Sequence, residues 1–139
     1  MAEPAPTRSG PGRVLITVYA IFALAAGARS GVQIATRFDQ APLAYTLSAL
    51  AAAIYVLATA ALATGGRTAR RVAVLSCTVE LAGVLAIGTF SLLEPGAFPD
   101  ETVWSGFGSG YGYVPLVLPI IGLAWLRRTA ASGRRADRP

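Results

Sequence analysis

The sequence predicts an all-α fold: a four-helix transmembrane bundle with both termini in the cytoplasm and a last helix that is short and proline-kinked. Of the 139 residues, 54% are hydrophobic and only 14% are charged, whereas about a quarter of the residues in a soluble domain are charged. Four apolar segments approach the roughly 20 residues that a helix needs to cross the hydrocarbon core. Arginines stand at the ends of these segments, where they act as topology signals. These observations indicate one membrane domain.

The spans are expected where apolar residues run with little interruption, at residues 14–35, 42–64, 72–93 and 111–126. Together they form a transmembrane domain from residue 13 to residue 128. The tails on either side, residues 1–12 and 129–139, are rich in Pro, Gly, Ser and Arg and are expected to be disordered, because they have little to bury. The last span covers only about 24 Å, so either the glycine-rich stretch before it enters the membrane interface or the span lies in a thinned part of the bilayer.

The distribution of arginine predicts the orientation of the bundle. With four spans, both tails and the link at residues 65–71 share one side of the membrane, and that side carries every arginine except Arg29 and Arg37. Cytoplasmic ends carry the excess of positive charge. We therefore expect a multi-pass protein of a bacterial cytoplasmic membrane with both termini inside the cell.

The first span has a second interpretation. An arginine, an apolar run at residues 14–25 and the tripeptide AGA at residues 26–28 together imitate a secretory signal peptide with its cleavage site. The apolar stretch continues beyond that point through Val32 and Ile34, which favours a span that is retained.

Composition excludes several classes of function. The chain has no histidine and one cysteine, Cys77, so an internal disulfide, a cysteine-cluster zinc site and any triad with a histidine base are excluded. We expect no enzymatic activity, no metal and no cofactor. The net charge of +5 could indicate nucleic acid, but the arginines flank apolar segments and do not form one soluble face, so no nucleic-acid partner is expected.

Polar residues recur at helical spacing along the first three spans and predict a polar seam inside the bundle. Polar groups that face hydrocarbon are costly, so these stripes should face one another. The candidate seam residues are Arg29, Gln33, Tyr45, Ser48, Tyr55, Thr59, Ser76 and Glu80. From their depths along the helices we expect a chain of contacts from Glu80 through the Tyr55 hydroxyl, or a water, to Arg29.

Glu80 has two possible roles in this seam. A carboxyl group that no cation compensates in hydrocarbon is neutral and can carry a proton, whereas one that Arg29 reaches stays charged and is a structural anchor. Both roles remain open at the level of sequence.

Small residues recur every four positions on the first span, at Ala23, Gly27, Gly31 and Ala35. This spacing lets a second backbone approach closely. The partner is either a neighbouring helix of the same chain or a second copy of the protein, and ordinary packing within an alanine-rich chain is the simpler interpretation.

The stretch WSGFGSGYGYVPLVLP, residues 104–119, contains GYG but departs from a potassium-channel filter. Gly108 and Ser109 precede it where the filter has Thr and Val. Its aromatic residues, Trp104, Phe107, Tyr111 and Tyr113, are expected to form an outer aromatic belt before the last span. Two prolines in the span lack amide donors and free carbonyl groups. The broken-helix candidate is therefore Gly110, Tyr111, Gly112, Pro115 and Pro119.

Three acids precede this stretch, Glu94, Asp100 and Glu101. They could bind a cation, but their spacing does not match the usual calcium loops, and a solvated loop is the expected structure.

The blocks RSGVQIATRFDQAPLAYTLSAL, VELAGVLAIGTFSLL and PDETVWSGFGSGYGYVPLVLPIIGLAWLRR resemble a group of small uncharacterised four-span integral membrane proteins of actinobacteria. The resemblance covers about residues 14–128, and its third block is the most specific. It implies four spans and the cytoplasmic membrane of a high-GC Gram-positive bacterium. It implies no activity and no site residues.

The leading functional hypothesis is a non-enzymatic accessory or interaction protein of the bacterial cytoplasmic membrane, with the lipid bilayer, other membrane proteins or a second copy as partners. The alternative is a small oligomeric transporter or channel that uses Glu80. The small multidrug resistance transporters also use a membrane Glu, but theirs lies in the first span.

Overall fold

The computed structural model describes residues 7, 8 and 10–136, with side chains up to residue 130. Within these residues the chain forms helices and turns and has no strand, which confirms the all-α prediction. The long helices are α1 (Pro11–Arg37), α2 (Pro42–Thr64), α3 (Gly66–Leu93) and α4 (Val114–Ala136), and the short 3-10 helices are η1 (Phe38–Gln40), η2 (Pro95–Ala97) and η3 (Ser105–Tyr111).

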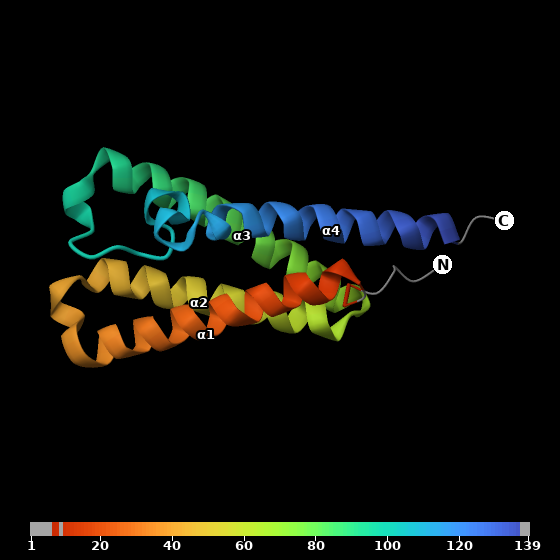
Figure 1. The fold of residues 1–139 in the computed structure, drawn as a ribbon, viewed down its shortest axis with the longest axis horizontal. Helices are drawn as coiled ribbons and strands as arrows, with labels where there is room; N and C mark the ends of the chain where they lie inside the picture. The colour runs from red at the N-terminus through yellow and green to blue at the C-terminus, as the bar shows by residue number, and fades with distance from the viewer. Residues whose placement is uncertain (1–6, 9, 137–139) are drawn as a thin grey trace.

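The helices run antiparallel along the chain (Figure 1). The α1-to-α2 and α3-to-η2 connections lie at one end, which we call the loop end. The short turn between α2 and α3 lies at the other end, together with the start of α1 and the end of α4. We call this second end the arginine end, because Arg67, Arg70 and Arg71 follow that turn.

Local signals explain the boundaries of α2, which coincide with the predicted span. Pro42 occupies the first turn, where its missing amide hydrogen costs nothing. At the other boundary Gly65 and Gly66 adopt φ values of 77° and 89°, a left-handed conformation that favours glycine and lets the chain reverse into α3. α3 begins at Gly66, before the predicted residue 72, because the arginines of the link are themselves helical.

α4 corrects the prediction of a short last span followed by a disordered tail. It starts at Val114, three residues after the expected Tyr111, and continues through Ala136. Residues 129–136, expected to be disordered, are therefore helical; residues 137–139 lie outside the described range. Arg70 fixes this part of α4, since its guanidinium donates hydrogen bonds to the Leu126 carbonyl at 2.6 Å and the Thr129 hydroxyl at 2.9 Å.

The predicted tail at residues 1–12 also differs from the structure in its last part. α1 begins at Pro11, and Thr7 is buried. The Thr7 hydroxyl donates to the Leu62 carbonyl of α2 at 2.5 Å, and the Trp125 indole of α4 donates to the Thr7 carbonyl at 2.9 Å. Thr7 thus joins α2 to α4. Residues 1–6 and 9 lie outside the described range.

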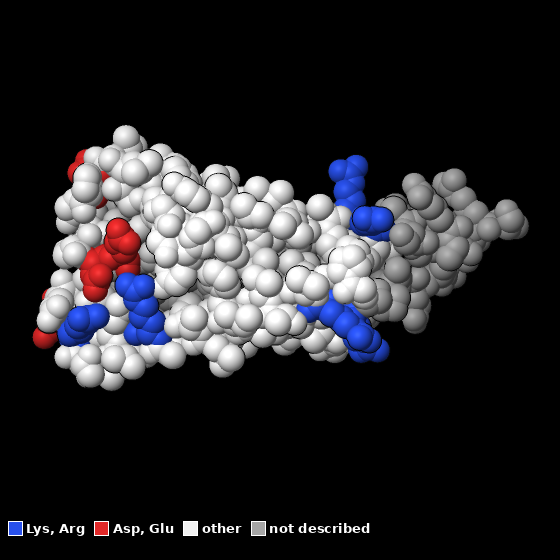
Figure 2. Space-filling model, viewed as in Figure 1, with Lys and Arg blue, Asp and Glu red and all other residues white. Residues whose placement is uncertain are grey.

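Among the residues that the structure describes, three helices are long and apolar enough to cross a membrane: α1 continued through η1, α2 and α3. A fourth span exists if η3 and α4 are taken together, and these two are bent by 98°. Large apolar side chains cover the outside, such as Leu24 at 74% exposure and Leu75 at 64%. On the face shown in Figure 2 the charged atoms lie toward the two ends, with an uncharged band between them. This distribution fits a multi-pass membrane protein.

The segment between α3 and α4 is packed inside the bundle at its loop end. Val103, Trp104 and Ser105 are buried. The Trp104 ring lies against Gly83 of α3, where an added Cβ would come within 2.6 Å of the ring, and the Phe107 ring lies in the same way against Gly88. Gly83 and Gly88 therefore provide the space that this segment occupies.

This packing corrects the expectation of an aromatic belt. Trp104 is buried at 3% exposure, Phe107 and Tyr111 are half-buried, and only Tyr113 is exposed. The backbone folds back sharply at Gly106, Phe107 and Gly108, where φ is 59°, 62° and 83°. Gly108 also lies against the Pro115 ring, which an added Cβ would approach to 2.8 Å. The glycines therefore build a compact turn and not a flexible approach.

Candidate intramembrane site

Glu80 lies near the middle of α3 and has no exposed surface. Its Oε1 accepts a hydrogen bond from the Tyr19 hydroxyl of α1 at 2.7 Å, and that hydroxyl lies 3.3 Å from the Cys77 Sγ. Gly122 of α4 closes the group, because an added Cβ there would lie 2.8 Å from the Cys77 sulfur. Three helices meet at this point. We call Tyr19, Cys77, Glu80 and Gly122 the Glu80 cluster.

The second carboxylate oxygen of Glu80 has no hydrogen-bond partner within the described part of the chain. An ionised carboxylate in hydrocarbon costs several kcal/mol unless a cation or several donors compensate it. Here one tyrosine hydroxyl is the only donor found among the described residues. The arrangement can therefore hold a proton on Glu80, and it can also serve as a polar link between α1 and α3.

The predicted chain from Glu80 through Tyr55 to Arg29 is wrong. Arg29 is exposed, and its Nη1 donates to the Tyr111 hydroxyl at 2.6 Å. The Tyr55 hydroxyl accepts from the Trp104 indole at 3.0 Å. Both partners come from the folded-back segment before α4, which the prediction had placed at the membrane surface.

Most of the predicted seam residues are buried, and their contacts fall into separate groups. Six of the eight predicted residues are buried: Gln33, Tyr45, Ser48, Tyr55, Ser76 and Glu80. Thr59 is half-buried, and its hydroxyl donates to the Tyr55 carbonyl at 2.7 Å. Arg29 is the predicted seam residue that lies outside.

The outer part of the seam binds the segment before α4. The Tyr45 hydroxyl donates to Asp100 Oδ2 at 3.0 Å, and the Ser48 hydroxyl accepts from the Val103 amide at 3.3 Å. Asp100 Oδ1 in turn accepts from the Glu101 amide at 3.0 Å. These polar groups on α2 therefore position the segment, and Asp100 is part of this packing. No cluster of three or more metal-ligating side chains occurs among the residues for which the structure gives positions.

Gln33 is the other member of the seam with an unsatisfied group. Its Nε2 is buried and has no partner among the residues described. It lies one turn beyond Arg29 on α1, toward the loop end.

The broken-helix candidate is only partly brought together. Gly110 and Gly112 are exposed and Tyr111 is half-buried, whereas Pro115 and Pro119 are buried. The break lies at Gly112 and Tyr113, ahead of both prolines, with φ of 64° and 62°. The Gly112 amide donates back to the Ser109 carbonyl at 3.4 Å. GYG in this chain is thus part of a turn.

The small-residue stripe of α1 is divided between two environments. Ala23 is buried, and an added Cβ at Gly27 would lie 4.0 Å from the Ala52 Cβ of α2. Gly31 has open space around it, and Ala35 is exposed. The first half packs within the chain, as the simpler interpretation expected.

Sequence reasoning missed Tyr19, Cys77 and Trp104 as members of the site. Tyr19 lies at helical spacing from Arg29 and Gln33, on the same face of the first span. Helical spacing alone could therefore have predicted that Tyr19 faces the seam. Cys77 adjoins Ser76 on α3. Trp104 had no such signal, because its burial depends on Gly83 of a different helix.

Comparison of the chain with models of known protein families, with curated proteins and with solved structures finds no match.

Proposed function

We propose that this protein is a non-enzymatic accessory protein of the bacterial cytoplasmic membrane that binds a transmembrane helix of another membrane protein. One observation carries the proposal: an apolar groove of about 630 Å³ runs between α1 and α4. Its lining residues are Pro11, Val14, Leu15, Val18, Gly112, Val114, Val117, Leu118 and Ile121.

The two walls of this groove have the spacing that helix packing uses. Val14 and Val18 lie four residues apart on α1, and Val114, Val117 and Ile121 lie three and four residues apart on α4. Such rows form parallel ridges, and a third helix packs between ridges of this kind. Val14 and Ile121 are exposed by 67% and 50%, so the ridges are open to a partner.

A photo-crosslinking residue at Val117 tests this proposal in native membranes. The matched control is Val56 of α2, which is 54% exposed and does not line the groove. We expect an adduct of one discrete mass from position 117 and none from position 56. The same adduct should be lost on Val14→Trp, which fills the groove. Equal adducts at both positions, or an adduct that survives the tryptophan, would contradict a docked helix.

The proposed orientation places the arginine end in the cytoplasm, and it follows from the positive-inside rule. Cysteines introduced at Thr68 and Gly96, near opposite ends, test it, because both positions are exposed and the native Cys77 is buried. An impermeant maleimide added to intact cells should label position 96 only. Labelling of position 68 alone would reverse the orientation.

A second candidate, a small transporter or channel that moves protons through Glu80, is favoured by the oxygen of Glu80 that lacks a partner among the described residues. Reconstituted liposomes with a pH-sensitive dye compare the wild type with Glu80→Gln, which keeps the acceptor for Tyr19. This candidate predicts proton flux that the substitution abolishes. Identical flux in both proteins would eliminate it.

A further inference from the structure

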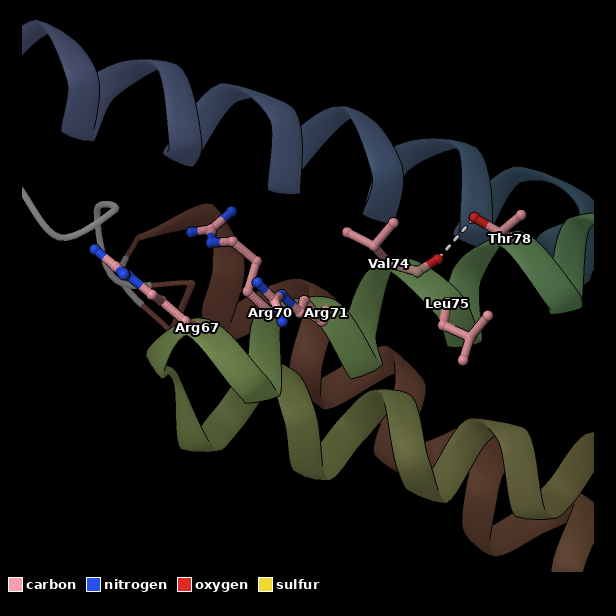
Figure 3. Close-up of a pocket in the computed structure, with 6 residues that line it drawn as sticks. All are labelled: Arg67, Arg70, Arg71, Val74, Leu75 and Thr78. Carbon is pink, nitrogen blue, oxygen red and sulfur yellow. Dashed lines mark hydrogen bonds between the residues drawn. The ribbon is translucent and has the colours of Figure 1, made fainter.

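The start of α3 carries a group of guanidinium side chains next to an apolar strip (Figure 3). They border a pocket of about 480 Å³. The lining residues are Arg67, Arg70, Arg71, Val74, Leu75 and Thr78. The charged and apolar halves of this pocket thus follow one another along a single helix.

Arg70 is held in a defined position. It extends from α3 toward α4 (Figure 3), where its guanidinium bonds to the Leu126 carbonyl and the Thr129 hydroxyl. Arg67 and Arg71 are exposed, one on each side of it in sequence. A fixed guanidinium with two exposed neighbours is suited to a phosphate, because planar guanidinium groups bind phosphate oxygens in pairs.

The backbone adds positive potential at the same place. The first turn of α3 contains no acidic residue, and Gly65 before it provides no side-chain cap. The first amide hydrogens of a helix lack partners within the helix, and the helix dipole favours an anion beside them.

The other half of the pocket is apolar and faces the outside of the bundle. Leu75 is 64% exposed and Val74 40%. Thr78 has a polar side chain, but its hydroxyl already donates a hydrogen bond to the Val74 carbonyl at 2.7 Å. From Arg71 to Thr78 the helix rises about 10 Å, comparable to the upper part of an acyl chain.

We propose that this pocket binds an anionic phospholipid, with the arginines around its phosphate and one acyl chain along Val74 and Leu75. The apolar strip selects a lipid over a soluble phosphate, because a small anion gains nothing from Val74 and Leu75. The exposed charge selects phosphatidylglycerol over phosphatidylcholine, whose own cation competes for the phosphate.

Native mass spectrometry of the full chain in detergent tests this proposal. The protein is titrated with phosphatidylglycerol and with phosphatidylcholine of the same acyl chains. The test variant carries Arg67→Gln and Arg71→Gln. The matched control carries Arg13→Gln and Arg128→Gln, which removes the same charge from two exposed residues that do not line the pocket. Circular dichroism checks that each variant keeps its helices.

The wild type should prefer phosphatidylglycerol by about tenfold or more, and the test variant should lose that preference while the control keeps it within about twofold. Arg71→Gln alone, a change at an exposed side chain, should lose part of it. Glycerol phosphate should displace little of the lipid. Equal loss in the test and control variants, binding without headgroup preference, or full displacement by glycerol phosphate would each overturn the proposal.

Discussion

At the loop end the chain between α3 and α4 folds back into the bundle, whereas at the arginine end two glycines join α2 directly to α3. Neutral side chains bind the backbone of the folded-back segment: Ser48 accepts from the Val103 amide, and Ser91 accepts from the Gly106 amide at 2.9 Å. The arginine end is held instead by Arg70, which bonds to the Leu126 carbonyl within α4, and by Thr7, which bonds to the Leu62 carbonyl near the end of α2. Packing of the loop therefore dominates at one end, and hydrogen bonds that join α2 and α3 to α4 dominate at the other.

This difference shows which part of a membrane bundle can accommodate a loop. A non-helical backbone at membrane depth is tolerated only when protein surrounds it. α3 meets that condition at the loop end, because its glycines accept aromatic rings. At the arginine end the link from α2 to α3 reverses at once, so this link needs no such space.

The largest effect is expected from Gly83→Leu. Its Cβ would fall within 2.6 Å of the Trp104 ring, so the segment must move out of the bundle or α3 must shift. Overpacking of this kind lowers the free energy of unfolding by about 3 kcal/mol. Equilibrium unfolding in mixed micelles measures it. Gly31→Leu is the control, since an added Cβ at Gly31 meets nothing within 4 Å. Equal losses at both positions would contradict the described packing of Trp104.

One tryptophan lies at each end, so matched substitutions compare how much each end contributes to stability. Trp104→Phe removes the indole donor to Tyr55 in a buried site, and Trp125→Phe removes the donor to the Thr7 carbonyl in a half-buried one. A buried acceptor left unpaired costs about 1–3 kcal/mol, so the Trp104 variant should lose about 2 kcal/mol and the Trp125 variant less. The same unfolding titration measures both. The reverse order would show that the arginine end is the more tightly packed one.

A smaller effect is expected at Tyr19, midway between the ends. Tyr19→Phe removes the donor to Glu80 Oε1. Hydrogen bonds between membrane helices contribute about 0.6 kcal/mol on average, with a maximum of about 1.7. We expect a loss in that range. A double-mutant cycle with Glu80→Leu, which removes the acceptor, should show coupling between the two side chains, and strict additivity would argue against their bond.

The smallest effect is expected from Arg29→Gln. The guanidinium is exposed and contacts Tyr111 at the surface of the bundle. Exposed polar contacts contribute little, so the unfolding transition should stay where it is. A large shift of the unfolding transition would indicate that Arg29 lies in the interior, as the sequence predicted.

The helices were predictable because their signals are local. Pro42 and the Gly65-Gly66 pair mark both ends of α2, and apolar runs define the rest. The burial of Glu80, Tyr55 and Ser48 also followed from helical spacing. The partners of Tyr55 and Ser48 did not, because Trp104 and Val103 reach them only after the segment before α4 has packed on Gly83 and Gly88. That packing joins residues from different parts of the chain, and periodicity within one helix contains no information about it.

Thr7 gives the bundle a closure that its loops do not provide. Its two hydrogen bonds connect the chain just before the first helix to the end of the second helix and to the last helix. Truncation of the protein to begin at Pro11 should therefore leave both the Leu62 carbonyl and the Trp125 indole without their Thr7 partner. The contact between α2 and α4 through Thr7 would then be lost. An expressed protein that begins at Pro11 should therefore be less stable than one that includes Thr7.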